Sequence, residues 1–122
     1  MAIDTVLVVD DSATDTHLIC SALNSAGYRT LSVGSAEDAI SVAKDEQPNA
    51  ILMDVVMPGT NGFQATRLLR NDPETADIPV IIVSSKDKAS DKVWGLRQGA
   101  VGYITKPFSS EELLEKLRDL DS

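Results

Sequence analysis

Five polar residues stand where strand-like apolar runs of this sequence end: Asp10, Asp11, Asp54, Ser84 and Lys106. Asp54 is the most informative of them, because the apolar run Ala50–Asp54 ends in this one carboxylate and residues 55–62 must then turn the chain. Packing alone gives little reason for such a residue. A carboxylate in this position can attack phosphorus and form an aspartyl phosphate. We therefore take Asp54 as the candidate nucleophile.

Asp10 and Asp11 add negative charge near Asp54 if the fold gathers these strand ends. Crowded carboxylates repel one another, and this repulsion raises a pKa or lowers stability. A bound divalent cation removes the repulsion. Oxygen ligands select a hard cation, and Mg²⁺ typically uses one or two carboxylates, several waters and a phosphate oxygen. The sequence predicts Mg²⁺ held by Asp10 or Asp11 together with Asp54. The backbone carbonyl of Val56 is a plausible further ligand, whereas Ca²⁺ needs more oxygens.

A phosphoryl group on Asp54 needs fixed partners for its negative charge. Lys106 can supply an ammonium group, and Ser84 can supply a hydroxyl donor. Loop amides near Val55 and Val56 can add hydrogen bonds. No histidine, cysteine or second base is required for this chemistry.

The elements that must position these residues follow from the apolar patterning. Five runs predict strands: Thr5–Val9, Tyr28–Val33, Ala50–Asp54, Pro79–Val83 and Gly102–Thr105. The first run is continuous and β-branched, and the third and fourth are continuous apolar runs, as in parallel strands buried on both faces. The second alternates, as a more exposed strand would.

Helical periodicity fills the segments between these runs. It predicts helices over about Ala13–Ala26 with Gly27 as the stop, after a Ser35 cap, over Asn61–Arg70, over about Ala89–Ala100, and after a Ser109–Glu112 capping box. In the third helix Ala65, Leu68 and Leu69 are expected on one side. In the fourth, Ala89, Val93, Leu96 and Ala100 are expected in register, and Trp94 is expected to pack.

Strands that alternate with helices predict an α/β fold with a doubly wound, five-stranded parallel sheet and helices on both faces. A flavodoxin-like order, 2-1-3-4-5, suits this count and puts the first and third strands side by side at the switch point. The carboxyl ends of the strands then form one rim. The five polar residues, scattered in sequence, would converge there.

Each of these residues also has a simpler structural explanation. A strand-end Asp is often a turn or cap residue, and Asp10-Asp11-Ser12 can cap a helix. Ser84-Ser85 could cap the fourth helix, and Lys106 could be a solvated charge. Their joint placement on one rim favours a functional site over five independent structural roles. His17 is expected on the polar side of the first helix, and Cys20 at the border of the core.

Composition limits the class of protein. The 122 residues suffice for one domain, residues 1–122, without room for a second, output domain. The net charge of −8 argues against nucleic acid and anionic membranes as partners. One cysteine rules out an internal disulfide and is compatible with a cytoplasmic protein. Neither a signal peptide nor a membrane span is apparent.

The motifs resemble those of the receiver domains of two-component response regulators, from Val6 to about Leu117. The resemblance rests on four stretches and a dipeptide: Val8–Ser12, Met53–Gly59, Asn61-Gly62, Val83–Ser85 and Tyr103–Phe108. It implies that Asp54 is the phosphoacceptor for a histidine kinase phosphohistidine, and that Asp10, Asp11 and the Val56 carbonyl match the Mg²⁺ site. Ser84 and Lys106 match the residues that sense the phosphoryl group.

The same resemblance implies a switch. Tyr103 occupies the position of the family's switch aromatic, and Lys106-Pro107 the position of a cis peptide. Phosphorylation is expected to draw Ser84 inward, let Tyr103 turn in and alter the face of the fourth helix, fifth strand and fifth helix, where a downstream effector binds. Ser85, often alanine in the family, is a departure that bears on access to the phosphoryl group.

A closer similarity, to stand-alone chemotaxis-type regulators of type IV pilus twitching motility, rests on residues 57–67 and 91–100. Such a protein is a signalling phosphoacceptor rather than an enzyme, and either an effector-binding switch or a phosphate sink would fit. One rival is a small Mg²⁺-dependent phosphohydrolase, which would need a second acid/base carboxylate and a cap over its substrate. Another is a pseudo-receiver used only for docking, which would have little use for the full polar set.

Overall fold

The computed structural model describes residues 3–57 and 59–121, with the side chain of residue 121 left aside. Within these residues five strands and five helices alternate: β1 (Thr5–Val9), α1 (Ala13–Ser25), β2 (Arg29–Val33), α2 (Ala36–Glu46), β3 (Ala50–Met53), α3 (Gly62–Asn71), β4 (Val80–Ser84), α4 (Ala89–Arg97), β5 (Gly102–Thr105) and α5 (Ser110–Asp121). Every helix and strand expected from the sequence is present, with ends shifted by a few residues at most. Pro58, part of the motif after Asp54, lies outside the described residues.

The strands form one parallel sheet in the order β2-β1-β3-β4-β5. This confirms the predicted doubly wound arrangement. β1 and β3 are neighbours, with Val9 opposite Met53, so the residues that follow them leave the sheet side by side. β3 and β4 are buried throughout, because helices cover both of their faces.

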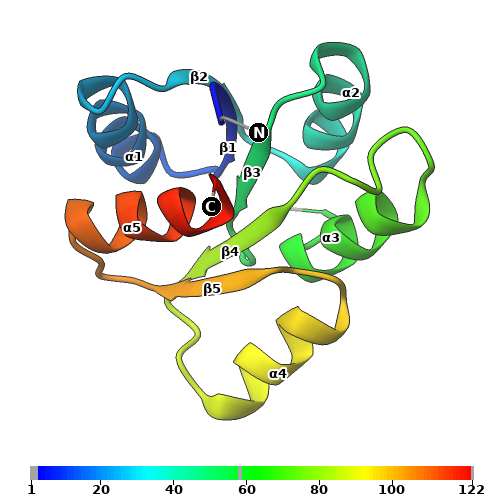
Figure 1. Ribbon diagram of the computed structural model, residues 1–122. Helices are drawn as coiled ribbons and strands as arrows, with labels where there is room; N and C mark the ends of the chain where they lie inside the picture. The colour runs from blue at the N-terminus through cyan, green and yellow to red at the C-terminus, as the bar shows by residue number, and fades with distance from the viewer. Residues whose placement is uncertain (1–2, 58, 122) are drawn as a thin grey trace.

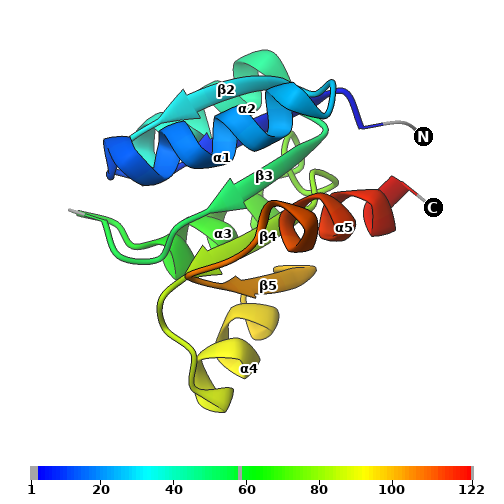
Figure 2. The same cartoon turned by 90° about the vertical axis from the view of Figure 1, so that its left-hand side faces the viewer.

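The helices cover the sheet in two layers (Figures 1 and 2). Figure 2 shows α1 and α5 in front of the sheet, while α2 and α3 lie on the other side. Ile19 and Leu23 of α1 join Leu113 and Leu117 of α5 in one core cluster. The alanines of α2 and Leu69 of α3 join the opposite cluster. α4 lies beside β5, at the edge of the sheet.

Helix starts follow the capping pattern of the sequence. Ser12 and Ser35 each accept a hydrogen bond from the amide three residues on, at 3.2 Å in both cases. Ser109 does the same for Glu112 at 3.1 Å. Gly27 follows the first helix with φ +95°, the left-handed conformation that was expected of it.

Three large aliphatic residues that were expected on the apolar side of a helix are exposed instead. Val93 and Leu96 of α4 are 51% exposed each, and Leu68 of α3 is 52% exposed. In α4 the buried position is Gly95, where an added Cβ would approach Ile82 Cδ1 to 2.8 Å. The helix therefore contacts the sheet through a residue without a side chain. Apolar periodicity cannot detect such a contact, and its apolar residues point elsewhere.

Smaller corrections concern single side chains. Trp94 is 49% exposed rather than packed, and Ala89 is exposed. α1 ends at Ser25, one residue before the expected Ala26. His17 is exposed and Cys20 packs at the border of the core, as predicted. Among the described residues, no helix is long and apolar enough to cross a membrane.

Candidate functional site

The backbone ladder of the sheet continues one residue past the strands and fixes the site residues. The amide of Asp54 donates to the carbonyl of Val9 at 2.9 Å, and the amide of Lys106 donates to the carbonyl of Ser84 at 2.8 Å. Asp54 therefore leaves β3 beside β1, and Lys106 leaves β5 beside β4. Gathering of these residues on one rim is a direct result of parallel strand pairing.

Three carboxylates meet at this rim. Asp10, Asp11 and Asp54 each offer an oxygen, and these atoms lie within 4.8 Å of one another. Asp10 is 5% and Asp54 7% exposed, whereas Asp11 is open to solvent. An all-oxygen set with one solvent-facing side fits Mg²⁺, which retains water ligands. Val56, the expected carbonyl ligand, lies in the adjoining loop with its side chain 60% exposed.

Lys106 is the cation of the site. Its Nζ lies 2.9 Å from Asp10 Oδ2, 2.8 Å from Asp15 Oδ2 and 3.6 Å from Asp54 Oδ1. Burial by itself would lower the pKa of Lys106, but the hydrogen bonds to Asp15 and Asp10 and the charge of Asp54 outweigh burial and raise it. The ammonium group is therefore charged throughout the physiological range, and it is not a solvated surface lysine.

Asp54 is destabilised as an anion. Burial, followed by the negative charge of Asp10, raises the pKa of Asp54 from 3.8 to about 6, against the opposing effect of Lys106. Desolvation and a like charge favour the protonated carboxyl. A cation placed among the three carboxylates would favour the anionic form that a nucleophile requires.

Ser84 is fully buried at the end of β4, where its Oγ accepts a hydrogen bond from the amide of Lys86 at 3.1 Å. It does not cap α4, which begins at Ala89. The Tyr103 hydroxyl donates to the carbonyl of Lys86 at 2.6 Å. Ser84 and Tyr103 thus hold the same loop, one from its amide side and one from its carbonyl side.

Tyr103 packs against a small cluster formed by Val55, Phe63, Ile82 and Ala100. Burial raises the pKa of its phenol above the usual range. The ring is already directed toward α4, within reach of Gly95. The Lys106-Pro107 peptide is cis, and Ser85 is exposed beside the site.

Two contributors escaped sequence reasoning. Asp15, in the first turn of α1, binds Lys106, and its place one turn after the Ser12 cap is the only signal that could have pointed to it. Gly62 starts α3 directly against the site, where a Cβ would lie 2.0 Å from the Asp54 carbonyl oxygen. Both act on Asp54 or Lys106 through tertiary contacts that periodicity does not encode.

We expect Asp15→Asn to increase the rate at which the candidate nucleophile Asp54 reacts with a small-molecule phosphodonor about threefold to tenfold. The substitution removes a negative charge beside Lys106, so the site attracts an anionic donor more strongly. Initial rates with acetyl phosphate measure the effect, and added salt should shrink it. Asp45→Asn, on the exposed end of α2, removes the same charge far from the site and serves as the control. An unchanged or lower rate for Asp15→Asn would contradict this role.

A parallel sheet in this order, with three carboxylates and a paired lysine on its carboxyl rim, defines a class of signalling protein. The family model of the response regulator receiver domain matches residues 6–118, and the chain belongs to this family.

Among its relatives is Protein PilH of Pseudomonas aeruginosa, 49% identical over 92% of this chain and 93% of that protein. The phosphate regulon transcriptional regulatory protein PhoB of the same species is 42% identical over 93% of this chain, which spans about half (50%) of PhoB.

Solved structures agree in fold. Chemotaxis protein CheY4 of Vibrio cholerae superposes with a TM-score of 0.90 at 29% identity, covering 97% of this chain and 98% of that one. The response regulator domain of Thermotoga maritima CheB gives 0.84 at 34% identity, covering 97% and 96%.

Proposed function

We propose that this protein is a stand-alone phosphoacceptor response regulator of a chemotaxis-like two-component phosphorelay. In it, Asp54 takes a phosphoryl group from the phosphohistidine of a histidine kinase in the cytoplasm. The observation that carries the proposal is the position of Asp54, buried between two further carboxylates and the Nζ of Lys106 at 3.6 Å. The near full-length similarity to PilH supports a single-domain regulator. The motif similarity described above favours control of type IV pilus twitching motility.

The chemistry needs few residues. An Asp54 carboxylate oxygen attacks phosphorus, the phosphorus–nitrogen bond of the phosphohistidine breaks, and the leaving imidazole takes up a proton. Asp10, Asp11, Asp54 and the Val56 carbonyl would hold Mg²⁺, which neutralises charge on the phosphoryl oxygens when bound. Lys106 pairs with a phosphoryl oxygen, and Ser84 donates a hydrogen bond to another after leaving the Lys86 amide. The chain catalyses only its own phosphorylation and dephosphorylation and has no separate substrate.

The output surface that fits this proposal is the face of α4, β5 and α5. Val93, Leu96 and Val101 are 51%, 51% and 47% exposed along it. When Ser84 turns toward the phosphoryl group, the 84–86 turn moves, and Tyr103 must find a new partner for its hydroxyl. A downstream effector that prefers the second packing shifts the population toward it.

The test is incubation with Mg²⁺ and acetyl phosphate, followed by intact mass measurement. We expect a phosphoryl adduct on the native chain and none on Asp54→Asn, while Asp77→Asn, an exposed carboxylate elsewhere, behaves as native. The absence of an adduct, or an adduct that survives Asp54→Asn, would overturn the assignment. In the same samples, phosphorylation should shift the amide resonances of Lys86 and α4. If Tyr103→Ala leaves the α4 shifts unchanged, the aromatic has no part in the switch.

A further inference from the structure

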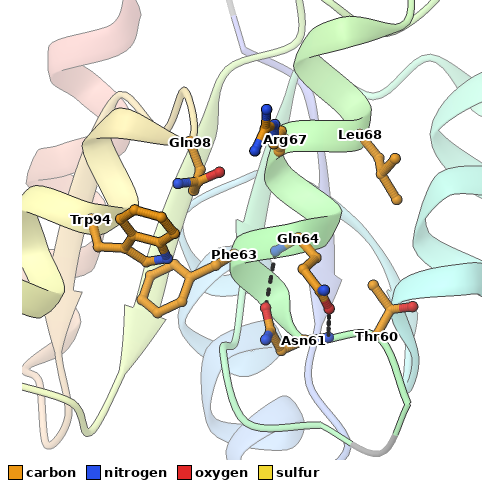
Figure 3. A pocket seen from close by; sticks show the side chains of 8 residues that line it. All are labelled: Thr60, Asn61, Phe63, Gln64, Arg67, Leu68, Trp94 and Gln98. Atoms are coloured by element: carbon orange, nitrogen blue, oxygen red, sulfur yellow. Dashed lines mark hydrogen bonds between the residues drawn. The ribbon is translucent and has the colours of Figure 1, made fainter.

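A groove separates α3 from α4 on the side of the sheet away from α1 and α5 (Figure 3). It has a volume of about 520 Å³. Eight residues line it: Thr60, Asn61, Phe63, Gln64, Arg67, Leu68, Trp94 and Gln98. None of the polar residues proposed for phosphoryl transfer is among them. The groove is therefore a separate feature of the surface.

Apolar side chains form the inner part of this groove. Trp94 comes from α4 and Phe63 from the start of α3, and Figure 3 shows their rings facing the same space. Phe63 is 9% exposed and belongs to the core, whereas Trp94 is 49% exposed. The half-exposed Trp94 beside the buried Phe63 offers a site where a binding partner can anchor an apolar side chain. Tryptophan contributes much of the binding energy at many interfaces.

The rim of the groove is polar and fixed. Asn61 and Gln64 form a reciprocal capping box, with hydrogen bonds of 2.9 and 3.3 Å that Figure 3 draws as dashed lines. Arg67, one turn further along α3, has no hydrogen-bond or ion-pair partner within the described ranges 3–57 and 59–121. Its guanidinium group is free to receive a carboxylate, which it can bind with two parallel hydrogen bonds.

The charge of this region is opposite to that of the chain. Segments 60–71 and 86–98 hold six of the eleven lysines and arginines: Arg67, Arg70, Lys86, Lys88, Lys92 and Arg97. They hold two of the nineteen acidic residues, Asp87 and Asp91. A molecule with a net charge of −8 thus concentrates its positive charge on the two helices that border the groove and on the loop that leads into α4. Electrostatic complementarity selects an acidic partner for this surface.

We propose that the α3–α4 groove binds an acidic amphipathic helix of a partner protein, which places an apolar side chain between Trp94 and Phe63 and a carboxylate on Arg67. In this mode of recognition a helix lies in a groove, and the partner helix contacts the groove through apolar residues at its positions i, i+3, i+4 and i+7. Leu96 and Val93 point to other sides of α4, so the groove is distinct from the effector face described above. The proposal does not depend on phosphorylation of Asp54.

The overall charge argues for protein rather than nucleic acid as the occupant. A polyanion with charge along its whole length would meet repulsion from the acidic remainder of the molecule. A short acidic helix contacts only the basic border. A second copy of this chain also carries acidic helices, and the experiment separates this case by its concentration dependence.

Trp94 is the one tryptophan of the sequence, so its fluorescence reports occupation of the groove directly. The probe is a synthetic helical peptide with leucines at i, i+3, i+4 and i+7 and glutamates elsewhere, titrated into the unphosphorylated chain. A peptide with lysine in place of every glutamate is the matched probe. Arg67→Glu tests the predicted ion pair, and Arg118→Glu on the exposed side of α5 is the matched control. Circular dichroism checks that both variants fold, and Arg67→Gln replaces Arg67→Glu if it does not.

We expect a saturable blue shift with the acidic peptide, at least tenfold weaker binding by Arg67→Glu, and binding by Arg118→Glu within about twofold of native. No saturable shift below about 1 mM peptide would overturn the proposal, as would equal binding of the lysine peptide. A blue shift that grows with protein concentration without peptide would assign the groove to a second copy instead. A larger shift with a single-stranded oligonucleotide would assign it to nucleic acid. Either result would also overturn the proposal.

Discussion

Gly62→Ala is expected to lower the free energy of unfolding by about 3 kcal/mol or more, because the new Cβ cannot be accommodated without moving backbone. That Cβ would lie 2.0 Å from the Asp54 carbonyl oxygen and 2.9 Å from Val55 Cα. Both contacts are with main-chain atoms, so no flexible side chain can yield. The amide of Gly62 also donates to the carbonyl of Val55 at 3.0 Å, which ties the start of α3 to the loop after Asp54.

Urea denaturation of the purified variants measures this loss. Gly27→Ala is the matched control: Gly27 has φ +95° but nothing within 4 Å of its missing Cβ. It should therefore lose only about 1 kcal/mol, through backbone strain alone. A Gly62→Ala loss no greater than that of Gly27→Ala would mean that the loop after Asp54 is looser than the structure describes.

Asp54→Asn is expected to raise the free energy of unfolding by about 2 to 3 kcal/mol near pH 7 without a divalent cation. The pKa of Asp54 rises from 3.8 to about 6 on folding, so the folded state binds this proton more tightly than the unfolded state does. The stabilising contribution of the protonated carboxyl is therefore complete below about pH 4 and is lost as the pH rises through about 6. Asparagine keeps the shape and removes the buried charge.

Denaturation of the native chain and of Asp54→Asn across this pH range tests the sign. The difference between them should be large at neutral pH and close to zero near pH 4. Added Mg²⁺ should stabilise the native chain more than the variant, because the proposed site for the cation is the folded carboxylate cluster. Asp77→Asn, on the exposed surface, should show neither effect. A variant less stable than the native chain near pH 7 would show that Lys106, and not burial or Asp10, dominates the energetics of Asp54.

Much of the fold was predictable because buried parallel strands can be recognised in the sequence as continuous apolar runs. Runs such as Thr5–Val9 have apolar residues on both faces, and their alternation with helices allows few topologies. α4 was predictable in its position but not in its orientation. This helix lies at the edge of the sheet and contacts the core through Gly95, so its apolar residues are exposed. The apolar repeat in its sequence therefore marks the exposed side of α4 and not the side that packs on the sheet.

The candidate site was predictable to the extent that the sheet builds it. Asp10, Asp54, Ser84 and Lys106 follow strands or end them, so strand order alone brings them together. Asp15 comes from a helix, and whether its side chain reaches Lys106 depends on the angle at which α1 leaves β1. The spacing of residues in the sequence does not predict that angle. The same holds for the groove, which exists because two separate helices leave a space between them.

The ion pairs of Lys106 join residues 96 and 91 positions apart in the sequence. During synthesis on the ribosome, the aspartates of the acidic cluster are therefore made well before Lys106. For most of that time the chain lacks the lysine whose positive charge offsets their negative charge. The three aspartates can come together once β1 and β3 pair, yet the cation arrives only with β5. The proposed transfer of a phosphoryl group to Asp54 thus depends on one of the last segments to be made, and we expect an incomplete chain not to accept the group.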